Sequence, residues 1–297
     1  AITIAAEAAV LVTGDRKYLQ LLRGHIDSLI DHGRIEDGRL LVPHNHTNDG
    51  WGEFRPILPH PPVHLWASST AAEDWNRLEV LREGCADEWR NVSSRPPRSL
   101  DDRAWTRYLA GDLPDYPEKI LQANYQEVVR RLDVIISDQQ DLTKMDVHHW
   151  QQVNPVVTEA LVHLTTGGPQ TIYWGGMAQG KVRYFDPVAN RAGLPADVAA
   201  LVSQVGVDGI TLTLVNLSAH ADREVIIGAG SFGEHRFGDV IADAAHGDGS
   251  ETIAANDTWL TVDLRPGTEI ELQLGMNYFC QQPSYAFPWH TEGVPVR

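Results

Sequence analysis

The sequence of 297 residues predicts a multidomain α+β protein, with helices first and antiparallel strands last. Two observations predict this order. Apolar residues recur at helical spacing up to about residue 168, and apolar and polar residues alternate from residue 210 onward. We therefore divide the chain into a helical domain (1–168), connecting strands and a helix (169–209), and a β domain with an aromatic C-terminal tail (210–297).

Punctuating residues support the individual helices. Thr70 and Glu73 have the spacing of a capping box, and Pro117 stands where a first-turn proline belongs. The first helix is apolar on nearly every face, which is typical of a helix buried on all sides. The predicted helices cover about residues 3–12, 15–31, 63–69, 70–84, 101–109, 117–136 and 154–167.

Strand signals come in two groups. Asp37-Gly38 predicts the turn of a hairpin over residues 35–42. In the connecting segment, residues 171–174 and 182–185 indicate strands, and residues 194–204 indicate a helix. The later strands are short and evenly spaced, which predicts an antiparallel β-sandwich. These strands are expected at residues 210–217, 224–229, 234–240, 258–264 and 269–274.

Composition limits the classes of function. A hydrophobic share of 42% and a charged share of 22% are those of a globular protein. The net charge of −16 argues against a nucleic-acid partner, because phosphate binding needs a basic surface. No apolar run is long enough for a membrane span. Cys85 and Cys280 are in no CxxC arrangement, so the compartment stays open, and a soluble secreted or periplasmic protein is one alternative.

The segment from Pro43 to Trp66 contains the first candidate site. It holds four histidines, two carboxylates, Arg55 and two tryptophans between prolines and glycines, and its first half shows no helix or strand period. Glycoside hydrolysis uses one protonated and one ionised carboxyl group, so Asp49 and Glu53 are the candidate catalytic residues. The plainer alternative is that Asp49 belongs to a turn and Glu53 pairs with Arg55.

Further residues are candidates for binding a substrate. Tryptophan rings stack on sugar faces, and side chains just before a helix N-terminus can bind hydroxyls. We expect the Pro43–Trp66 segment and a second cluster at residues 146–154 to meet at one cleft. The candidate binding residues are His46, Trp51, Arg55, Asp115, Tyr116, His148, His149, Trp150 and Asn154.

Metal and cofactor signals are weak. His44-x-His46 and Asp146-x-His148-His149 offer metal-ligating groups, yet neither spacing matches a signature such as HExxH. The chain also lacks GxSxG, a P-loop and a Rossmann fingerprint, which argues against esterases, NTPases and nicotinamide enzymes. We therefore expect neither a metal nor a cofactor.

Helix pairs with long inner loops, followed by an all-β domain, resemble the architecture of an (α/α) toroid joined to a β-sandwich, which many glycoside hydrolases and polysaccharide lyases share. The resemblance covers the layout of the whole chain and includes no diagnostic motif. It implies a carbohydrate substrate, with hydrolysis first and lyase chemistry by His, Tyr and Arg as the alternative. The helices are fewer than in a complete toroid. We therefore expect an incomplete toroid, completed by a missing N-terminal part, a second polypeptide or a homo-oligomer. A further alternative is a non-catalytic subunit that binds carbohydrate or completes a site with another chain.

Overall fold

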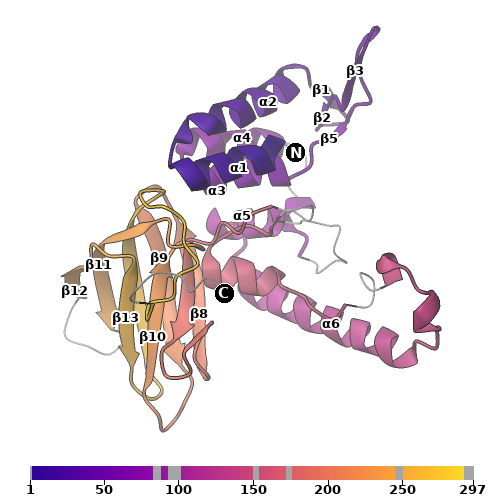
Figure 1. Ribbon diagram of the computed structural model, residues 1–297. Helices are drawn as coiled ribbons and strands as arrows, with labels where there is room; N and C mark the ends of the chain where they lie inside the picture. The colour runs from indigo at the N-terminus through magenta and orange to yellow at the C-terminus, as the bar shows by residue number, and fades with distance from the viewer. Residues whose placement is uncertain are drawn as a thin grey trace.

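The computed structural model describes residues 2–82, 88–92, 102–149, 154–171, 176–244 and 250–290. The protein has a helical part and a β part, so the predicted α+β class is confirmed (Figure 1). Within the described residues, no helix is both long and apolar enough to cross a membrane.

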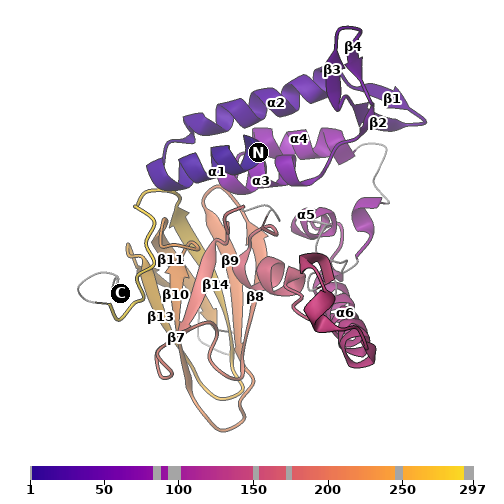
Figure 2. The same ribbon diagram turned by 45° about the vertical axis from the view of Figure 1, so that its right-hand side comes forward.

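Four helices at the N-terminus pack together (Figures 1 and 2). Apolar residues from the first three of them, among them Val10, Leu22 and Leu65, share one buried cluster. The expected pair of helices at the start is confirmed, but Val12 is 55% exposed, so the first helix is not buried on all sides as predicted. The elements are α1 (Ile2–Thr13), a short 3₁₀ turn (Arg16–Tyr18), α2 (Leu19–Asp31), α3 (His60–Ser69) and α4 (Ala72–Arg82).

The predicted capping box at Thr70 is wrong. Thr70 is the C-cap of α3 in a left-handed conformation, with φ of 54°, and its backbone N–H donates to the carbonyl of Trp66. Its hydroxyl donates to the carbonyl of Ser69 and not to the first turn of α4. The end predicted for α4 at Gly84 lies outside the described residues.

Short hairpins connect α2 to α3. The hairpin predicted at residues 35–42 is confirmed, with Asp37 and Gly38 both at positive φ, as a two-residue turn of this kind requires. The next stretch also forms a hairpin, although the sequence there shows no strand period. His46 and Trp51 are register partners in this hairpin, and their rings are in contact. The strands are β1 (Arg34–Glu36), β2 (Arg39–Val42), β3 (Asn45–Thr47), β4 (Gly50–Gly52) and β5 (Arg55–Pro56).

The remaining helices lead to the β part. The regular helix predicted from Pro117 is confirmed, whereas the helix expected from Asn154 begins only at Glu159 and ends, as predicted, with Gly167 in a left-handed conformation. The elements are a 3₁₀ turn (Glu88–Arg90), α5 (Arg103–Leu109), α6 (Tyr116–Ser137), a second 3₁₀ turn (Leu142–Lys144) and the π-helical turn η4 (Leu161–Thr166).

The β part consists of two antiparallel sheets. One has the strand order β13-β10-β6-β7 and the other β12-β11-β14-β9-β8. Alternate residues of both sheets point into one buried cluster, as the period-two pattern requires. The strands are β6 (Val182–Asp186), β7 (Arg191–Ala192), β8 (Val198–Val205), β9 (Gly209–Asn216), β10 (Arg223–Ala229), β11 (Arg236–Ala244), β12 (Ser250–Ala254), β13 (Trp259–Leu264) and β14 (Glu269–Asn277).

The helix predicted at residues 194–204 is wrong, because residues 198–205 form strand β8. Alanine and leucine favour a helix, but this segment pairs with β9 along its whole length, and sheet pairing outweighs a weak local preference. Of the strand expected at 171–174, residues 172–174 lie outside the described part of the chain.

The described part of the C-terminal segment packs back on the molecule, mainly on the β part. The rings of Phe287 and Trp289 lie 5.4 and 5.9 Å from that of Phe185 on β6. Phe279 is the exception, since it packs against the α1–α2 cluster. The helical and β parts therefore meet along α1, α3 and the segment that follows β14.

Candidate functional site

The predicted catalytic carboxylates lie on exposed hairpins. Asp49 is in the turn of β3–β4, and Glu53 accepts a hydrogen bond of 2.9 Å from Arg55 with both side chains more than half exposed. His46 and Trp51 are also exposed, and their rings lie 4.8 Å apart. This is the plainer arrangement that the sequence also allowed for Glu53.

The second cluster lies elsewhere. His148 is 3.4 Å from Asp146 and exposed, and His149 is 2.8 Å from Asp138. The Oδ1 atom of Asn154 accepts a hydrogen bond from the backbone N–H of Val156, and Trp150 lies outside the described residues. Figures 1 and 2 show β3 and β4 well apart from the segment after α6, so the structure does not bring the two clusters into one cleft.

Asp115 and Tyr116 stand side by side in sequence but in opposite surroundings. Asp115 is half exposed and pairs with Lys119 at 2.7 Å. Tyr116 is buried, and its hydroxyl lies 2.6 Å from Nδ1 of His163, whose Nε2 lies 2.8 Å from Asp102. These three side chains form a buried chain of hydrogen bonds between α5, α6 and η4.

This chain is closely packed. The ring of Trp105 stacks on His163 at 4.9 Å, and the backbone N–H of Gln170 donates to Asp102. Burial alone would raise the pKa of Asp102, but the hydrogen bond and charge of His163 lower it below the usual value. Through these hydrogen bonds the three side chains connect α5, α6 and η4 in a buried network.

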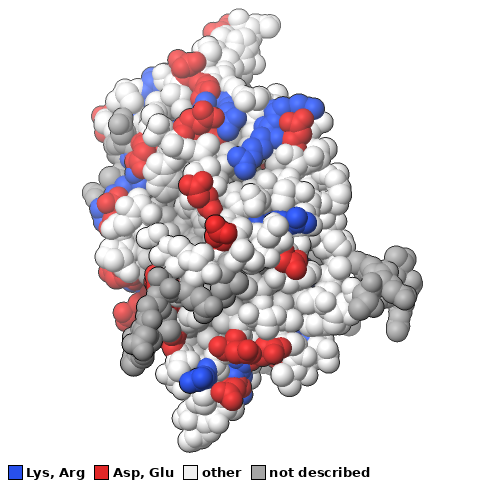
Figure 3. All heavy atoms as spheres, turned by 90° about the vertical axis from the view of Figure 1, so that its left-hand side faces the viewer, with Lys and Arg blue, Asp and Glu red and all other residues white. Residues whose placement is uncertain are grey.

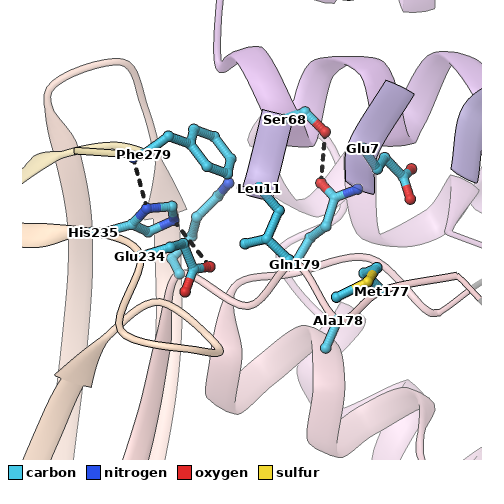
Figure 4. A pocket seen from close by; sticks show the side chains of 10 residues that line it. Glu7, Leu11, Ser68, Met177, Ala178, Gln179, Glu234, His235 and Phe279 are labelled. Carbon is cyan, nitrogen blue, oxygen red and sulfur yellow. Dashed lines mark hydrogen bonds and ion pairs between the residues drawn. The ribbon is translucent and has the colours of Figure 1, made fainter. Parts of the chain in front are cut away.

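A different set of titratable groups lines a pocket between the helical and β parts (Figure 4). The space available to the centre of a water molecule is about 10 Å³, which suits about one water. Its lining residues come from α1, α3, the segment before β6, the turn between β10 and β11, and the segment after β14. They are Glu7, Leu11, Ser68, Met177, Ala178, Gln179, Lys181, Glu234, His235 and Phe279.

On the helical side, a buried carboxylate meets a buried imidazole. Oε1 of Glu7 lies 2.7 Å from Nδ1 of His64, while Oε2 of Glu7 has no hydrogen-bond partner among the described residues. Burial alone would lower the pKa of His64, but the hydrogen bond and charge of Glu7 raise it above the usual value. Ser68 donates to Gln179 at 2.9 Å, as Figure 4 shows.

On the β side, burial shifts three ionisable groups toward their neutral forms. Burial lowers the pKa of Lys181 to about 8, although the charge of Glu234 opposes this effect. The pKa of Glu234 is raised by burial, and the pKa of His235 is lowered well below its usual value, again mainly by burial. Figure 4 shows His235 between Glu234 and the backbone of Phe279.

The local geometry explains how Glu234 is held. Its carboxylate accepts hydrogen bonds from the backbone N–H groups of Ser231 and Phe232. Gly230, with φ of 92°, makes this possible because a Cβ there would overlap the Glu234 carboxylate. The Lys181 ammonium donates to the carbonyl of Ala67 on α3, which ties the β part to the helices.

Sequence reasoning missed these pocket residues. One signal was present: Glu7 is the single charged residue in the apolar helix α1, and a buried charge requires a partner. The sequence around Lys181 and Glu234 does not indicate that they line one pocket. They lie 53 positions apart in the chain, and only the folding of the β part brings them together.

Two of the remaining histidines of the Pro43–Trp66 segment line another pocket, of about 260 Å³. His44 and His60 lie there with His25 among apolar side chains. Burial, with the charge of His64, lowers the pKa of His60 to about 4.

Over the described ranges, no group of three or more His, Cys, Asp or Glu residues could hold a metal ion. Cys280 is an exposed free thiol, and Cys85 is outside the described residues.

Acidic groups on one face of the molecule are dispersed. On the face shown in Figure 3, they form separate patches, with basic groups between some of them. The charged groups described on this face therefore form no continuous field of one sign.

Comparisons with known proteins give little further information. No curated protein matches the chain. A xyloglucanase of glycoside hydrolase family 44 from Paenibacillus polymyxa aligns at 12% identity with a TM-score of 0.23, over 29% of this chain and 18% of the xyloglucanase. Residues 34–162 match a domain of unknown function, DUF8034.

Proposed function

We propose that the protein is a carbohydrate-active enzyme, a glycoside hydrolase whose acid and base are Glu234 and Glu7. The observation that carries this proposal is that two buried carboxyl groups, in contrasting surroundings, line one pocket. In glycosidases, two carboxyl groups in different environments have different pKa values, so that one serves as the acid and the other as the base.

Glu234 suits the role of general acid. It is 1% exposed, and burial raises its pKa, so that its carboxyl group retains a proton at a higher pH than a carboxyl in water. The backbone N–H groups of Ser231 and Phe232 fix its orientation. In the proposed reaction its proton passes to the glycosidic oxygen as the bond to the anomeric carbon breaks.

Glu7 suits the role of base or nucleophile. Its Oε1 atom lies 2.7 Å from Nδ1 of His64, and this hydrogen bond helps to raise the pKa of His64. The other oxygen has no hydrogen-bond partner among the described residues and is available to a water or a substrate. The Ser68 and Gln179 side chains add hydrogen-bonding groups for sugar hydroxyls.

Substrate entry requires the pocket to open, because the present space suits about one water. Met177, Ala178 and Gln179 form the loop segment of the lining, and outward movement of this loop would break the hydrogen bond from Ser68 to Gln179. In the proposed mechanism this loop moves outward to admit the sugar.

The test is a screen of oligosaccharides and chromogenic glycosides, scored by release of reducing ends. We expect Glu234→Gln and Glu7→Gln to lower kcat at least 100-fold, the order of a lost general acid or base. Asp49→Asn and Glu53→Gln are the corresponding variants of the two carboxylates predicted from the sequence to be catalytic. If those two variants abolish turnover while Glu234→Gln retains it, the site belongs to the β3–β4 region and this assignment is wrong.

The same screen separates the alternatives. A product that absorbs in the ultraviolet, as an unsaturated uronate does, would identify a polysaccharide lyase. Sugar binding without turnover would identify a non-catalytic binding subunit. Either result overturns the hydrolase proposal.

A further inference from the structure

The pocket that contains His25, His44 and His60 is separate from the pocket of Glu7 and Glu234, because no described residue lines both. Its volume of about 260 Å³ is close to the lower end of the range of about 300–1,000 Å³ that is usual for small-molecule sites. Apolar side chains form most of its walls. They come from α1, α2, β2, α3 and the connections that follow β2 and β5, and they are Ile2, Leu29, Val42, Pro43, Ile57, Leu58 and Pro61.

The three imidazoles of this pocket are available to a ligand. Among the hydrogen bonds of the described residues, none involves the ring of His25, His44 or His60. The ring of His32, by contrast, lies 2.8 Å from the carbonyl oxygen of Ser28. His25 and His44 are exposed, and His60 is partly buried. Because a neutral imidazole carries one N–H donor, a molecule in the pocket can receive a hydrogen bond from each ring.

The electrostatic surroundings of the pocket favour a negative charge. The chain has 40 acidic residues, yet none of the described residues that line this pocket is Asp or Glu. His60 and Pro61 begin the ten-residue helix α3, so the positive end of its dipole lies at the pocket. The charge of His64 also reaches His60. Burial is the main cause of the lowered pKa of His60, the charge of His64 lowers this pKa further, and the charge of Asp102 opposes the effect.

The arrangement of the imidazoles suits an organic molecule and not a single metal ion. In the part of the chain that the structure describes, His25, His44 and His60 do not form a group that could hold a metal. They surround the pocket together with apolar walls, and such walls are best covered by an apolar body. A ligand that fits both features therefore has an anionic end and an apolar end.

We propose that this pocket binds a small carboxylic acid with an apolar body. Its carboxylate accepts hydrogen bonds from the imidazoles of His25, His44 and His60, and its body packs against the apolar walls. Hydrogen bonds to an ionised acceptor are roughly twice as strong as those between neutral groups, so the carboxylate supplies most of the selectivity. This binding site does not depend on the proposed function.

The first experiment measures binding by isothermal titration calorimetry with pairs of probes. Each pair is a carboxylate and its neutral amide, namely hexanoate and hexanamide, octanoate and octanamide, and phenylacetate and phenylacetamide. We expect a carboxylate of this panel to bind with a Kd below about 1 mM and its amide to bind at least about 10-fold more weakly. Equal affinities within each pair, or no carboxylate that binds below about 1 mM, overturn the proposal.

The second experiment locates the bound probe. We expect His25→Ala/His44→Ala, which replaces two exposed side chains, to weaken binding of the carboxylate at least about 10-fold. His60→Ala should have a similar effect, and circular dichroism checks that each variant is folded. His220→Ala is the matched control, because His220 is an exposed histidine on the β part, and it should keep the wild-type affinity. In NMR spectra, the imidazole signals of His25, His44 and His60 should shift when the carboxylate is added.

The remaining outcomes separate this pocket from other sites. Carboxylate binding that survives His25→Ala/His44→Ala overturns the proposal. Binding that Glu234→Gln abolishes places the probe in the other pocket and also overturns it. A titration with Zn²⁺ that shifts the three imidazole signals, while no carboxylate binds, identifies a metal site in place of the proposed one.

Discussion

Glu7 and His64 form a buried pair across the helical part, with 2.7 Å between Oε1 and Nδ1 and 57 positions between them in the chain. Both side chains are almost fully buried. A buried charge of this kind needs its partner, so the pair ties α1 to α3 at the edge of the pocket.

Removing the Glu7 charge will destabilise the fold. We expect Glu7→Gln to lower the free energy of unfolding by about 3–5 kcal/mol, because it leaves His64 buried without its counter-charge. Urea denaturation measures this loss. Glu53→Gln is the control, because Glu53 is an exposed carboxylate that also has an ionic partner. We expect this substitution to lower the free energy of unfolding by less than about 1 kcal/mol.

The same pair predicts a pH dependence. The pKa of His64 is raised in the folded state, so its stabilisation is fully present below the unfolded value of 6.5 and is lost as the pH rises through the folded value. We therefore expect the stability of the wild type to fall above pH 6.5 as His64 loses its proton. The stability of Glu7→Gln should depend less on pH in this range. Equal slopes for both proteins in thermal melts would contradict this account.

At higher pH, Lys181 should make stability rise with pH, which is the opposite of the effect of His64. Its pKa of about 8 in the folded state lies below the unfolded value of 10.5, so the unfolded chain binds more protons between these values. This group therefore makes the protein more stable as the pH rises above 8, by about 3 kcal/mol at most. Comparing Lys181→Met with wild type between pH 8 and pH 9.5 isolates the contribution, since the variant lacks this slope.

Gly230 should control the position of Glu234. Gly230→Ala adds a Cβ that overlaps the Glu234 carboxylate, and it also places alanine at φ of 92°. Gly111→Ala is a matched control, because Gly111 has φ of 80° and open space around it, so it reports the backbone strain alone. We expect both variants to lose about 1–2 kcal/mol from strain and Gly230→Ala to lose more. Similar losses in urea denaturation would show that Glu234 moves aside freely.

The hydrogen bond between Tyr116 and His163 should contribute measurably to the free energy of unfolding. Tyr116→Phe leaves a buried ring nitrogen without this partner, which costs about 1–3 kcal/mol. Tyr125→Phe, on the exposed side of the same helix, should change stability by less than about 0.5 kcal/mol. Equal effects of the two substitutions would contradict the assignment of a buried network.

The amino-acid sequence by itself determined the elements whose local signals are strong. Pro117 and regular apolar spacing predicted α6, and Asp37-Gly38 predicted the turn between β1 and β2. Period-two alternation predicted β9 and β14, because one face of each strand is more deeply buried than the other.

Only the tertiary structure decided what depends on distant partners. Residues 198–205 became a strand because they pair antiparallel with β9, with one irregularity between Val202 and Gln204. One polar face of α6 is buried because Arg131 donates to the carbonyls of Asn154 and Val156, and Leu121, Tyr125 and Ile136 of the same helix stay exposed. Glu7, Lys181 and Glu234 line one pocket because the helical and β parts meet there. Local propensity acts over a few residues, whereas the burial and pairing of charges depend on groups that only the folded chain brings together.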